Sequence, residues 1–299
     1  MALIPVQAML AAAQRGGYAI GYFESWSLDS LLAIADAAEA MKSPVLLGFS
    51  GIYLPHPERV VADPLGAYAA MGLEVCRSLS VSANLVFNES PHEEWVRLAI
   101  ELGFGLVMFS DESLATDVQI EKVEEIVQAA HLAGIAVEGE AVALPGVGGS
   151  LVEVPEDFRM TDPNAGREFV ERTGVDAFAV NIGQAHFHGR RKVPLDLERL
   201  GELHNAIPVP LVLHGSSSVD SSDLRQAIRL GIRKINVSSC LKQAYLEALR
   251  QACSAIGRDY HPYEVIGSGL ESDILVAGRT ALMKTVEDYL VLFGSTNRA

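Results

Sequence analysis

The stretch Ala165-Gly-Arg-Glu-Phe-Val-Glu-Arg-Thr-Gly-Val-Asp-Ala-Phe-Ala-Val-Asn-Ile182 contains the unit from which the fold is expected to be built. Its first part, Ala165–Thr173, is helix-like, and Ala177–Ile182 is a short β-prone run. Gly174 lies between the two, as is typical of the residue that follows the last turn of a helix. The stretch therefore predicts a helix that leads directly into a strand.

The same alternation recurs along the whole chain, with strand starts about 30 residues apart, the length of one βα unit. The predicted strands are Tyr18–Phe23, Pro44–Gly48, Val81–Val86, Phe104–Phe109, Ile135–Glu140, Ala177–Ile182, Pro210–His214 and Lys234–Val237. Helices are predicted between them, for example over Leu28–Ala40, Glu93–Leu102, Glu121–Ala133, Ala165–Thr173 and Ser222–Leu230. Eight such units without an intervening Pro/Ser-rich linker predict an α/β fold, a single-domain closed (β/α)8 TIM barrel over residues 1–299. An open doubly wound sheet is the alternative, but it would need an extra domain to use all eight strands.

The composition of the chain limits the kinds of molecule that it is expected to bind. The chain has 299 residues and a formal net charge of −15, which argues against nucleic acid or an anionic membrane surface as a partner. Its three cysteines show no CxxC spacing and fit a reducing cytoplasm. The apolar N-terminus lacks a cationic region before it, and no run of 18 apolar residues occurs, so we expect neither a signal peptide nor a membrane span.

Polar residues follow the predicted strands, where the active sites of barrels lie. They are Glu24, Ser50, Asn84, Asn88, Ser110, Asp111, Glu140, His186, His214 and Asn236, and they are expected to converge on one rim. Two long loops, 141–161 and 183–194, lie on the same rim. The first contains Pro145-Gly-Val-Gly-Gly-Ser150, which suits either a lid or a plain surface loop.

Two hydroxyl-rich turns indicate an anion site. Val212-Leu-His-Gly-Ser-Ser-Ser218 and Lys234-Ile-Asn-Val-Ser-Ser239 each run from a strand end through serines toward a helix. Backbone N–H groups and hydroxyls suit a phosphate, and barrels commonly bind phosphate after strands seven and eight. The alternative is that the serines merely cap helices.

Histidines and carboxylates on the same rim indicate a divalent-metal site. His186 and His214 follow neighbouring strands, and two imidazoles with a carboxylate, Glu140 or Glu24, make a credible ligand set. The run Arg190-Arg-Lys192 is expected to attract an anionic substrate, with Arg191 assigned to its phosphate, although a solvated charge run is an equal alternative.

These residues together resemble the class II, zinc-dependent ketose-bisphosphate aldolases, in particular the tagatose- and fructose-bisphosphate branch. The matching segments run nearly end to end: Gly17-Tyr-Ala-Ile, Ser43-Pro-Val-Leu-Leu, Ala136-Val-Glu-Gly-Glu140, Thr161-Asp-Pro, Thr173-Gly-Val-Asp-Ala-Phe-Ala-Val, Ile182-Gly-Gln-Ala-His186, Val212-Leu-His-Gly-Ser-Ser217, Gly231–Val237 and Gly294-Ser-Thr-Asn-Arg298.

The resemblance implies a (β/α)8 barrel, a homodimer or homotetramer, and a zinc ion that polarises the ketone of dihydroxyacetone phosphate and stabilises the enediolate. It implies zinc binding by His186 and His214, with Glu140 close to the metal. It also implies phosphate binding by Gly215, Ser217, Asn236 and Ser239, to which we add Ser50.

Four positions depart from the family pattern. The family carries His-Leu-Asp-His-His at the end of the third strand, where the aligned residues here are Asn84-Leu-Val-Phe-Asn88. This alignment puts Val86 at the catalytic Asp and Phe87 at the third zinc histidine. Ser110 stands at an acidic position and Gly148 at the glutamate of the lid loop. Val, Phe and Gly neither take protons nor bind zinc, so the pattern indicates changed or lost chemistry.

The sequence therefore predicts a metal-dependent carbon–carbon lyase that acts on a phosphorylated ketose or triose with altered chemistry. Glu24, where the sugar aldolases usually have an amide, and Glu140 are the predicted catalytic carboxylates, although Glu24 could equally be a solvent-facing loop acid. Two alternatives stay open: a non-catalytic phosphosugar-binding or companion subunit, and an isomerase or hydrolase on the same barrel.

Overall fold

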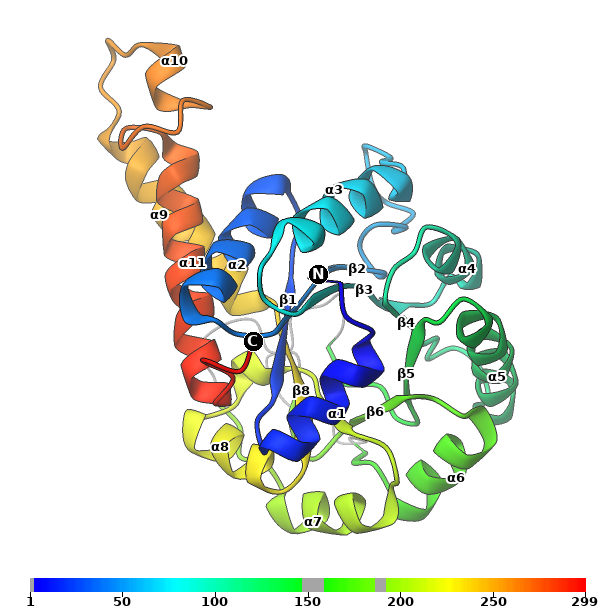
Figure 1. Cartoon of the computed structure of the whole chain (residues 1–299). Helices are drawn as coiled ribbons and strands as arrows, with labels where there is room; N and C mark the ends of the chain where they lie inside the picture. The colour runs from blue at the N-terminus through cyan, green and yellow to red at the C-terminus, as the bar shows by residue number, and fades with distance from the viewer. Residues whose placement is uncertain (1–2, 147–158, 186–191) are drawn as a thin grey trace.

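Eight parallel strands form the closed barrel that the sequence predicts. In the computed structural model, which describes residues 3–146, 159–185 and 192–299, neighbouring strands pair in chain order and β1 also pairs with β8 (Figure 1). The strands are β1 Ile20–Glu24, β2 Val45–Ser50, β3 Ala83–Ser90, β4 Leu106–Phe109, β5 Ala136–Glu140, β6 Ala177–Val180, β7 Leu211–Leu213 and β8 Ile232–Val237. The TIM-barrel prediction is confirmed, and the alternative of an open sheet is wrong.

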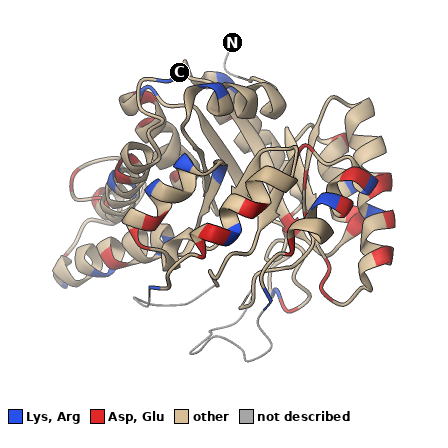
Figure 2. Cartoon of the chain, turned by 90° about the horizontal axis from the view of Figure 1, so that it is seen from below, with Lys and Arg blue, Asp and Glu red and all other residues tan. Residues whose placement is uncertain are grey.

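Helices surround the barrel. They are α1 Val6–Gly16, α2 Leu28–Met41, α3 Leu65–Ser78, α4 Glu93–Glu101, α5 Thr116–Leu132, α6 Pro163–Thr173, α7 Leu197–Ala206, α8 Ser221–Arg229, α9 Ser239–Ala255, α10 Pro262–Val265 and α11 Ile274–Phe293. Gly174 ends α6 with φ 73°, as the opening stretch predicts. Charged residues of both signs mark these helices, whereas the strands inside carry few (Figure 2). In the described part of the chain, no helix combines the length and apolar character needed to span a bilayer.

The apolar core has two layers. The larger one lies between the strands and the surrounding helices. The smaller one fills the barrel with inward-facing residues such as Leu46, Val86 and Leu106, and continues into Val6 and Leu10 of α1. Helix α1 therefore covers the amino-terminal mouth of the barrel, and the polar strand ends lie at the opposite mouth.

The third strand differs from its prediction. It continues four residues past Val86 to Ser90, with a register shift between Phe87 and Ser90 that marks a β-bulge. Asn84, which we expected on the catalytic rim, lies at the other end, where its Nδ2 donates to the carbonyl of Ile4 over 2.7 Å. The prediction for Asn84 is wrong because Asn84 lies near the start of the strand. The strand continues through Asn88 and Glu89, and these two residues lie at the rim instead.

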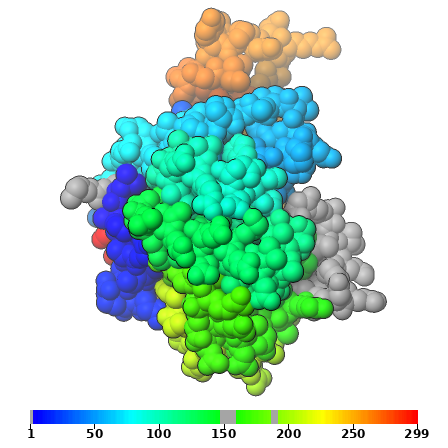
Figure 3. Space-filling view, turned by 90° about the vertical axis from the view of Figure 1, so that its right-hand side faces the viewer, coloured from blue at the N-terminus to red at the C-terminus, as the bar shows by residue number. Residues whose placement is uncertain are grey.

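Helices α9 and α11 extend as an arm beyond the barrel (Figure 1). The segment between them, which contains α10, stands clear of the rest of the molecule in the space-filling view (Figure 3). It carries exposed apolar side chains, namely Tyr260, Tyr263, Ile266 and Leu270.

Candidate active site

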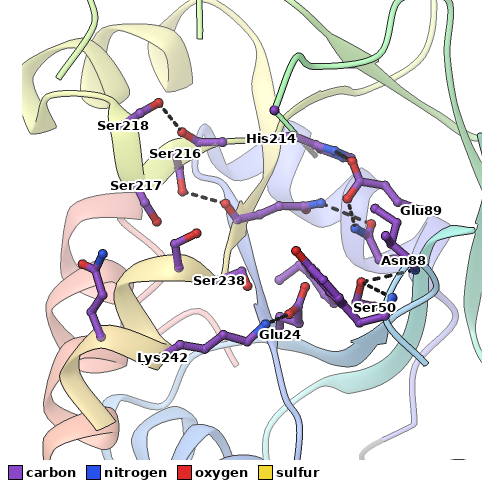
Figure 4. Close-up of a pocket in the computed structure, with 18 of the residues that line it drawn as sticks. Glu24, Ser50, Asn88, Glu89, His214, Ser216, Ser217, Ser218, Ser238 and Lys242 are labelled. Atoms are coloured by element: carbon purple, nitrogen blue, oxygen red, sulfur yellow. Dashed lines mark hydrogen bonds and ion pairs between the residues drawn. The ribbon is translucent and has the colours of Figure 1, made fainter. Parts of the chain in front are cut away.

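A pocket opens at the carboxyl-terminal mouth of the barrel (Figure 4). Side chains from the ends of β1, β2, β3, β7 and β8 and from the start of α9 line it. Eight of the sequence-predicted residues meet around it: Glu24, Ser50, Asn88, His214, Gly215, Ser217, Asn236 and Ser239. The convergence on one rim follows from the parallel strands, whose carboxyl ends share one edge.

A chain of buried charged groups leads from the barrel interior to this pocket. Lys234 Nζ lies 2.8 Å from Glu138 Oε2, and Glu138 Oε1 lies 2.6 Å from His214 Nε2. On its other side, His214 Nδ1 lies 2.8 Å from Glu89 Oε1. Lys234 and Glu138 are fully buried, and His214 is 1% exposed. Such charges persist away from water only because each one has a partner.

The carboxylates determine the charge of His214. Burial alone would lower the pKa of its imidazole, but Glu89 and Glu138 outweigh burial and raise the pKa to about 10. Burial likewise tends to raise the pKa of Glu138, but Lys234 and His214 reverse that effect and lower it. The ring is therefore a cation between two carboxylates at neutral pH.

Glu140 comes from the same strand as Glu138 and faces the same way, because side chains alternate along a strand. Ser110 Oγ donates to Glu140 Oε1 over 2.5 Å, and the other oxygen, Oε2, has no hydrogen-bond partner among the described residues. Burial, followed by the nearby charge of Glu89, raises the pKa of this carboxyl group to about 8. The site thus contains a carboxyl group that costs free energy to ionise without a cation beside it.

Three of these side chains form a candidate metal centre. One ligand atom each from Glu89, Glu140 and His214 lies within 4.8 Å of the others. The donor types suit a divalent transition metal, and the buried Oε2 of Glu140 that lacks a partner is an atom that a cation would satisfy. Glu138 would hold His214 from behind through Nε2, the usual support for a metal-binding imidazole. The residues present therefore fit a metal.

Two of the four departures from the family pattern, Val86 and Phe87, lie in β3 and do not line the pocket. Val86 is inside the barrel, and Phe87 points outward, with its ring 6.5 Å from that of Trp95. The β3 residues that line the pocket are Asn88 and Glu89. Glu89 has φ 49° beside the bulge, the kind of local distortion that re-aims a side chain next to an active site. Sequence reasoning missed Glu89 because nothing in the local sequence marks the bulge.

Glu138 and Lys234 were also missed as functional residues, although the sequence held a signal for both. Glu138 is two residues before Glu140, so a strand there must direct both carboxyl groups into the barrel. Lys234 lies two residues before Asn236 in β8, Ile232–Val237, so both side chains point to the same face of the strand. An acid and a base that both point into the barrel are expected to form a buried ion pair, as Glu138 and Lys234 do.

The two hydroxyl-rich turns lie beside each other. Gly215 has φ 65°, a backbone conformation that favours glycine, and a Cβ there would lie 2.9 Å from Leu144 Cδ2 and displace the end of that side chain. Ser216 Oγ donates to the carbonyl of Asn236, which ties the β7 turn to β8. The half-buried serines 217, 238 and 239 line the pocket. Asn236 Nδ2 donates to Asn88 Oδ1 over 3.2 Å, which connects the anion motif to β3.

Two predicted residues have partners that the sequence did not reveal. Ser50 Oγ accepts hydrogen bonds from the backbone N–H groups of residues 52 and 53, in a turn that follows β2. Glu24 lies at the end of β1, is 8% exposed and forms an ion pair with Lys242 of α9. The candidate metal cluster contains Glu89 rather than Glu24.

Three predictions lie outside the described residues: His186 as a metal ligand, Arg191 as a phosphate contact, and Gly148 with most of the proposed lid.

The comparisons with known proteins agree with the barrel fold. The model of the family "Fructose-bisphosphate aldolase class-II" matches residues 4–298. A sulfofructosephosphate aldolase from Alkalicoccus urumqiensis is 30% identical, with 100% of this chain and 99% of that protein covered. A fructose-bisphosphate aldolase from Thermus caldophilus is 29% identical, with 97% and 98% covered. The crystal structure of the YdjI aldolase from Escherichia coli K12 superposes with a TM-score of 0.81 at 27% identity and 99% coverage of each chain.

The closed parallel barrel, with imidazole and carboxylate groups at its carboxyl-terminal mouth, has the architecture of a TIM-barrel enzyme with a candidate metal centre. The chain belongs to the class II fructose-bisphosphate aldolase family. Membership indicates an aldolase-type lyase, in a family that typically depends on a metal.

Proposed function

We propose that this protein is a divalent-metal-dependent carbon–carbon lyase that cleaves a phosphorylated ketose, with zinc as the metal that the family favours. The observation that carries the proposal is the cluster of Glu89, Glu140 and His214, two of which, Glu89 and His214, line the same pocket as the hydroxyl-rich turns. One end can hold a cation, and the other offers donors to a phosphate.

The proposed site differs from the family pattern in the residues that the third strand contributes. A shift of the alignment by two residues keeps the direction of every side chain in a strand. It moves Glu89 to the position of the third zinc histidine and Asn88 to that of the catalytic Asp. We therefore propose that a carboxylate replaces one imidazole of the metal site, with His186 as a further ligand.

The side chains of the site divide several roles between them in this proposal, and Glu140 takes two. Bound at Glu89, Glu140 and His214, the metal would polarise the ketone of the substrate. Glu138 holds the imidazole through Nε2, so that Nδ1 faces the ligand side. Gly215, Ser217, Asn236, Ser239, Ser50 and Arg191 are the proposed phosphate contacts. Glu24 and Glu140 remain the proposed carboxylates for proton exchange, a role in which such groups contribute about 10²–10⁴-fold in rate.

The test combines metal content with cleavage. Elemental analysis of the purified protein should give one divalent ion per chain, and Glu89→Gln and His214→Ala should each lose it. The wild-type protein should release a triose phosphate from at least one member of a panel of ketose 1-phosphates and 1,6-bisphosphates. Glu124→Gln, at an exposed residue of the outer helix α5, is the matched control and should keep both properties.

Other outcomes separate the alternatives. A full metal content with consumption of a phosphosugar but no triose release would indicate an isomerase or hydrolase. Absence of metal after reconstitution would overturn the proposal and leave a phosphosugar-binding or companion subunit.

We also propose that the chain assembles as a homodimer or homotetramer through its arm. The exposed apolar residues Tyr263 and Ile266 lie at the end of the arm, away from the barrel. Light scattering after size exclusion should give a multiple of 32.1 kDa, and Tyr263→Glu with Ile266→Glu should lower it. A monomeric wild-type protein would overturn this proposal.

A further inference from the structure

The pocket contains an ion pair between its wall and α9. Glu24 at the end of β1 is bound to Lys242, which lies in the first turn of α9 (Figure 4). Lys242 is the only lysine or arginine among the described residues that line this pocket. Any anion that enters the described part of the pocket therefore meets one side-chain ammonium group, and that group already has a carboxylate partner.

Lys242 has the position needed to reach the hydroxyl-rich turns. Ser239, Lys242 and Leu246 are spaced by three and four residues, so they share one face of α9, and all three line the pocket. Ser238 precedes the helix, and Ser217 Oγ accepts a hydrogen bond from the backbone N–H of Cys240. The ammonium group and the half-buried serines are thus on the same end of the pocket.

The surroundings of Lys242 allow it to change partner. Its side chain is 42% exposed, whereas that of Glu24 is 10% exposed. The ammonium lies 5.3 Å from the ring centroid of Tyr53 and 5.8 Å from that of Trp26. Aromatic faces attract a cation without using up its N–H donors. A long, partly solvated side chain held by two rings keeps its place while one ionic partner replaces another.

We infer that Lys242 is an exchangeable anion contact: the phosphate group of the ligand takes Lys242 from Glu24 and leaves the Glu24 carboxylate free in the pocket. The inference rests on the proposed function for the identity of the ligand. It makes Lys242 a binding residue that no family motif discussed above supplies. It also makes Glu24 a carboxylate whose availability depends on an occupied anion site.

Exchange predicts opposite effects for the two partners, which a purely structural ion pair does not. We would titrate the purified protein with inorganic phosphate by calorimetry. Lys242→Met should weaken phosphate binding about tenfold or more, the value of a charge-assisted contact, and Lys242→Arg should largely retain it. Glu24→Gln should tighten binding severalfold, because phosphate no longer competes with a carboxylate. Lys284→Met, at an exposed lysine of α11, is the matched control and should bind like wild type.

Trp26 offers an independent readout, because Lys242 lies over its ring. The chain has two tryptophans, so a Trp95→Phe variant keeps Trp26 alone. In this variant, phosphate should change the tryptophan fluorescence. The added Lys242→Met change should abolish that response. Circular dichroism of each variant checks that it is folded.

Equal phosphate affinity in Lys242→Met and wild type, weaker binding in Glu24→Gln, or no phosphate binding by wild type would each overturn the inference. These measurements require neither metal nor turnover. If the expected phosphate effects are absent but the protein binds metal and cleaves substrate, this inference is rejected and the proposed function is not. The expected phosphate effects in a protein without metal or cleavage would instead reject the proposed function alone.

Discussion

Two lysine–glutamate ion pairs lie near the same pocket, and they differ in their position in the barrel and in their exposure to water. Lys234 and Glu138 join β8 to β5 inside the barrel, and both side chains are 0% exposed. Lys242 and Glu24 join α9 to β1 at the rim, and their side chains are 42% and 10% exposed. The first pair also holds His214, and the second contacts two aromatic rings.

The difference separates a fixed part of the pocket from an exchangeable one. Without water, the inner charges depend on each other, so they hold one arrangement of His214, Glu138 and Lys234. At the rim, water reaches the Lys242 ammonium group, so this pair depends less on its charged partner than the inner pair does. The pocket therefore combines a rigid end suited to a cation with an adaptable end suited to an anion.

The largest effect is expected from breaking the inner pair. Lys234→Met leaves Glu138 buried with only His214 as a partner, and we expect a loss of about 3–5 kcal/mol in the free energy of unfolding. Urea denaturation followed by circular dichroism measures it. Adding Glu138→Gln to this variant removes the unpaired charge and should restore part of the loss. A single variant as stable as wild type would show that the inner pair is not fixed by its partners.

The second effect concerns pH in the presence of a chelator. Glu140 has a pKa raised to about 8 in the folded protein, against an ordinary value of 4.5, so the folded state keeps a proton that the unfolded state has lost. Stability from this group is complete below about pH 4.5 and is lost as pH rises through 8.

The raised pKa of His214 has the same sign, with its contribution complete below 6.5 and lost through about 10. Melting temperature should therefore fall by several degrees between pH 5 and 9, and Glu140→Gln should flatten the lower part of the curve. Zinc should stabilise the protein more at pH 8 than at pH 6, because its ligands must lose protons. A melting temperature that rises with pH in chelator would contradict these assignments.

An intermediate effect is expected at Gly215, between the two ends of the pocket. Gly215→Ala places a side chain at φ 65° and a Cβ 2.9 Å from Leu144 Cδ2, and it should cost about 1–2 kcal/mol of stability. Adding Leu144→Ala removes the close contact but not the backbone strain. Thermal unfolding of the three variants separates the two causes. Full stability in Gly215→Ala would show that the turn adapts.

The smallest effect is expected at the rim. Lys242→Met should change the free energy of unfolding by less than about 1 kcal/mol, because the ion pair is partly solvated. The measurement is the same urea titration as for Lys234→Met, so the two lysines form a direct contrast. A loss as large as that of the inner pair would make the rim pair structural and end the distinction between the two ends.

Sequence patterns predicted most of the fold and about half of the site, for identifiable reasons. The alternation of helix, glycine and strand depends on local residues, so Gly174 and the eight strands could be predicted. Residues at the end of a strand or directly after it, such as Glu140 and His214, were found because barrel topology fixes where strand ends meet.

The rest depended on geometry that no local pattern shows. The bulge in β3 moves the rim from Val86 to Asn88 and Glu89, and only tertiary pairing with β4 reveals it. Lys242 escaped notice because it lies on a helix that looks like an ordinary outer element, and its partner Glu24 is 218 residues away. Long-range ion pairs of this kind leave no spacing signal in a single sequence.

Helix α1 determines from which side a small molecule can enter the barrel. Its apolar face closes the amino-terminal mouth of the barrel, so the described part of the molecule admits a ligand to His214 from the opposite mouth. Two fragments produced by cleavage would share that exit. The fragment beside Lys242 would stand nearer to it than one beside His214, which is 1% exposed.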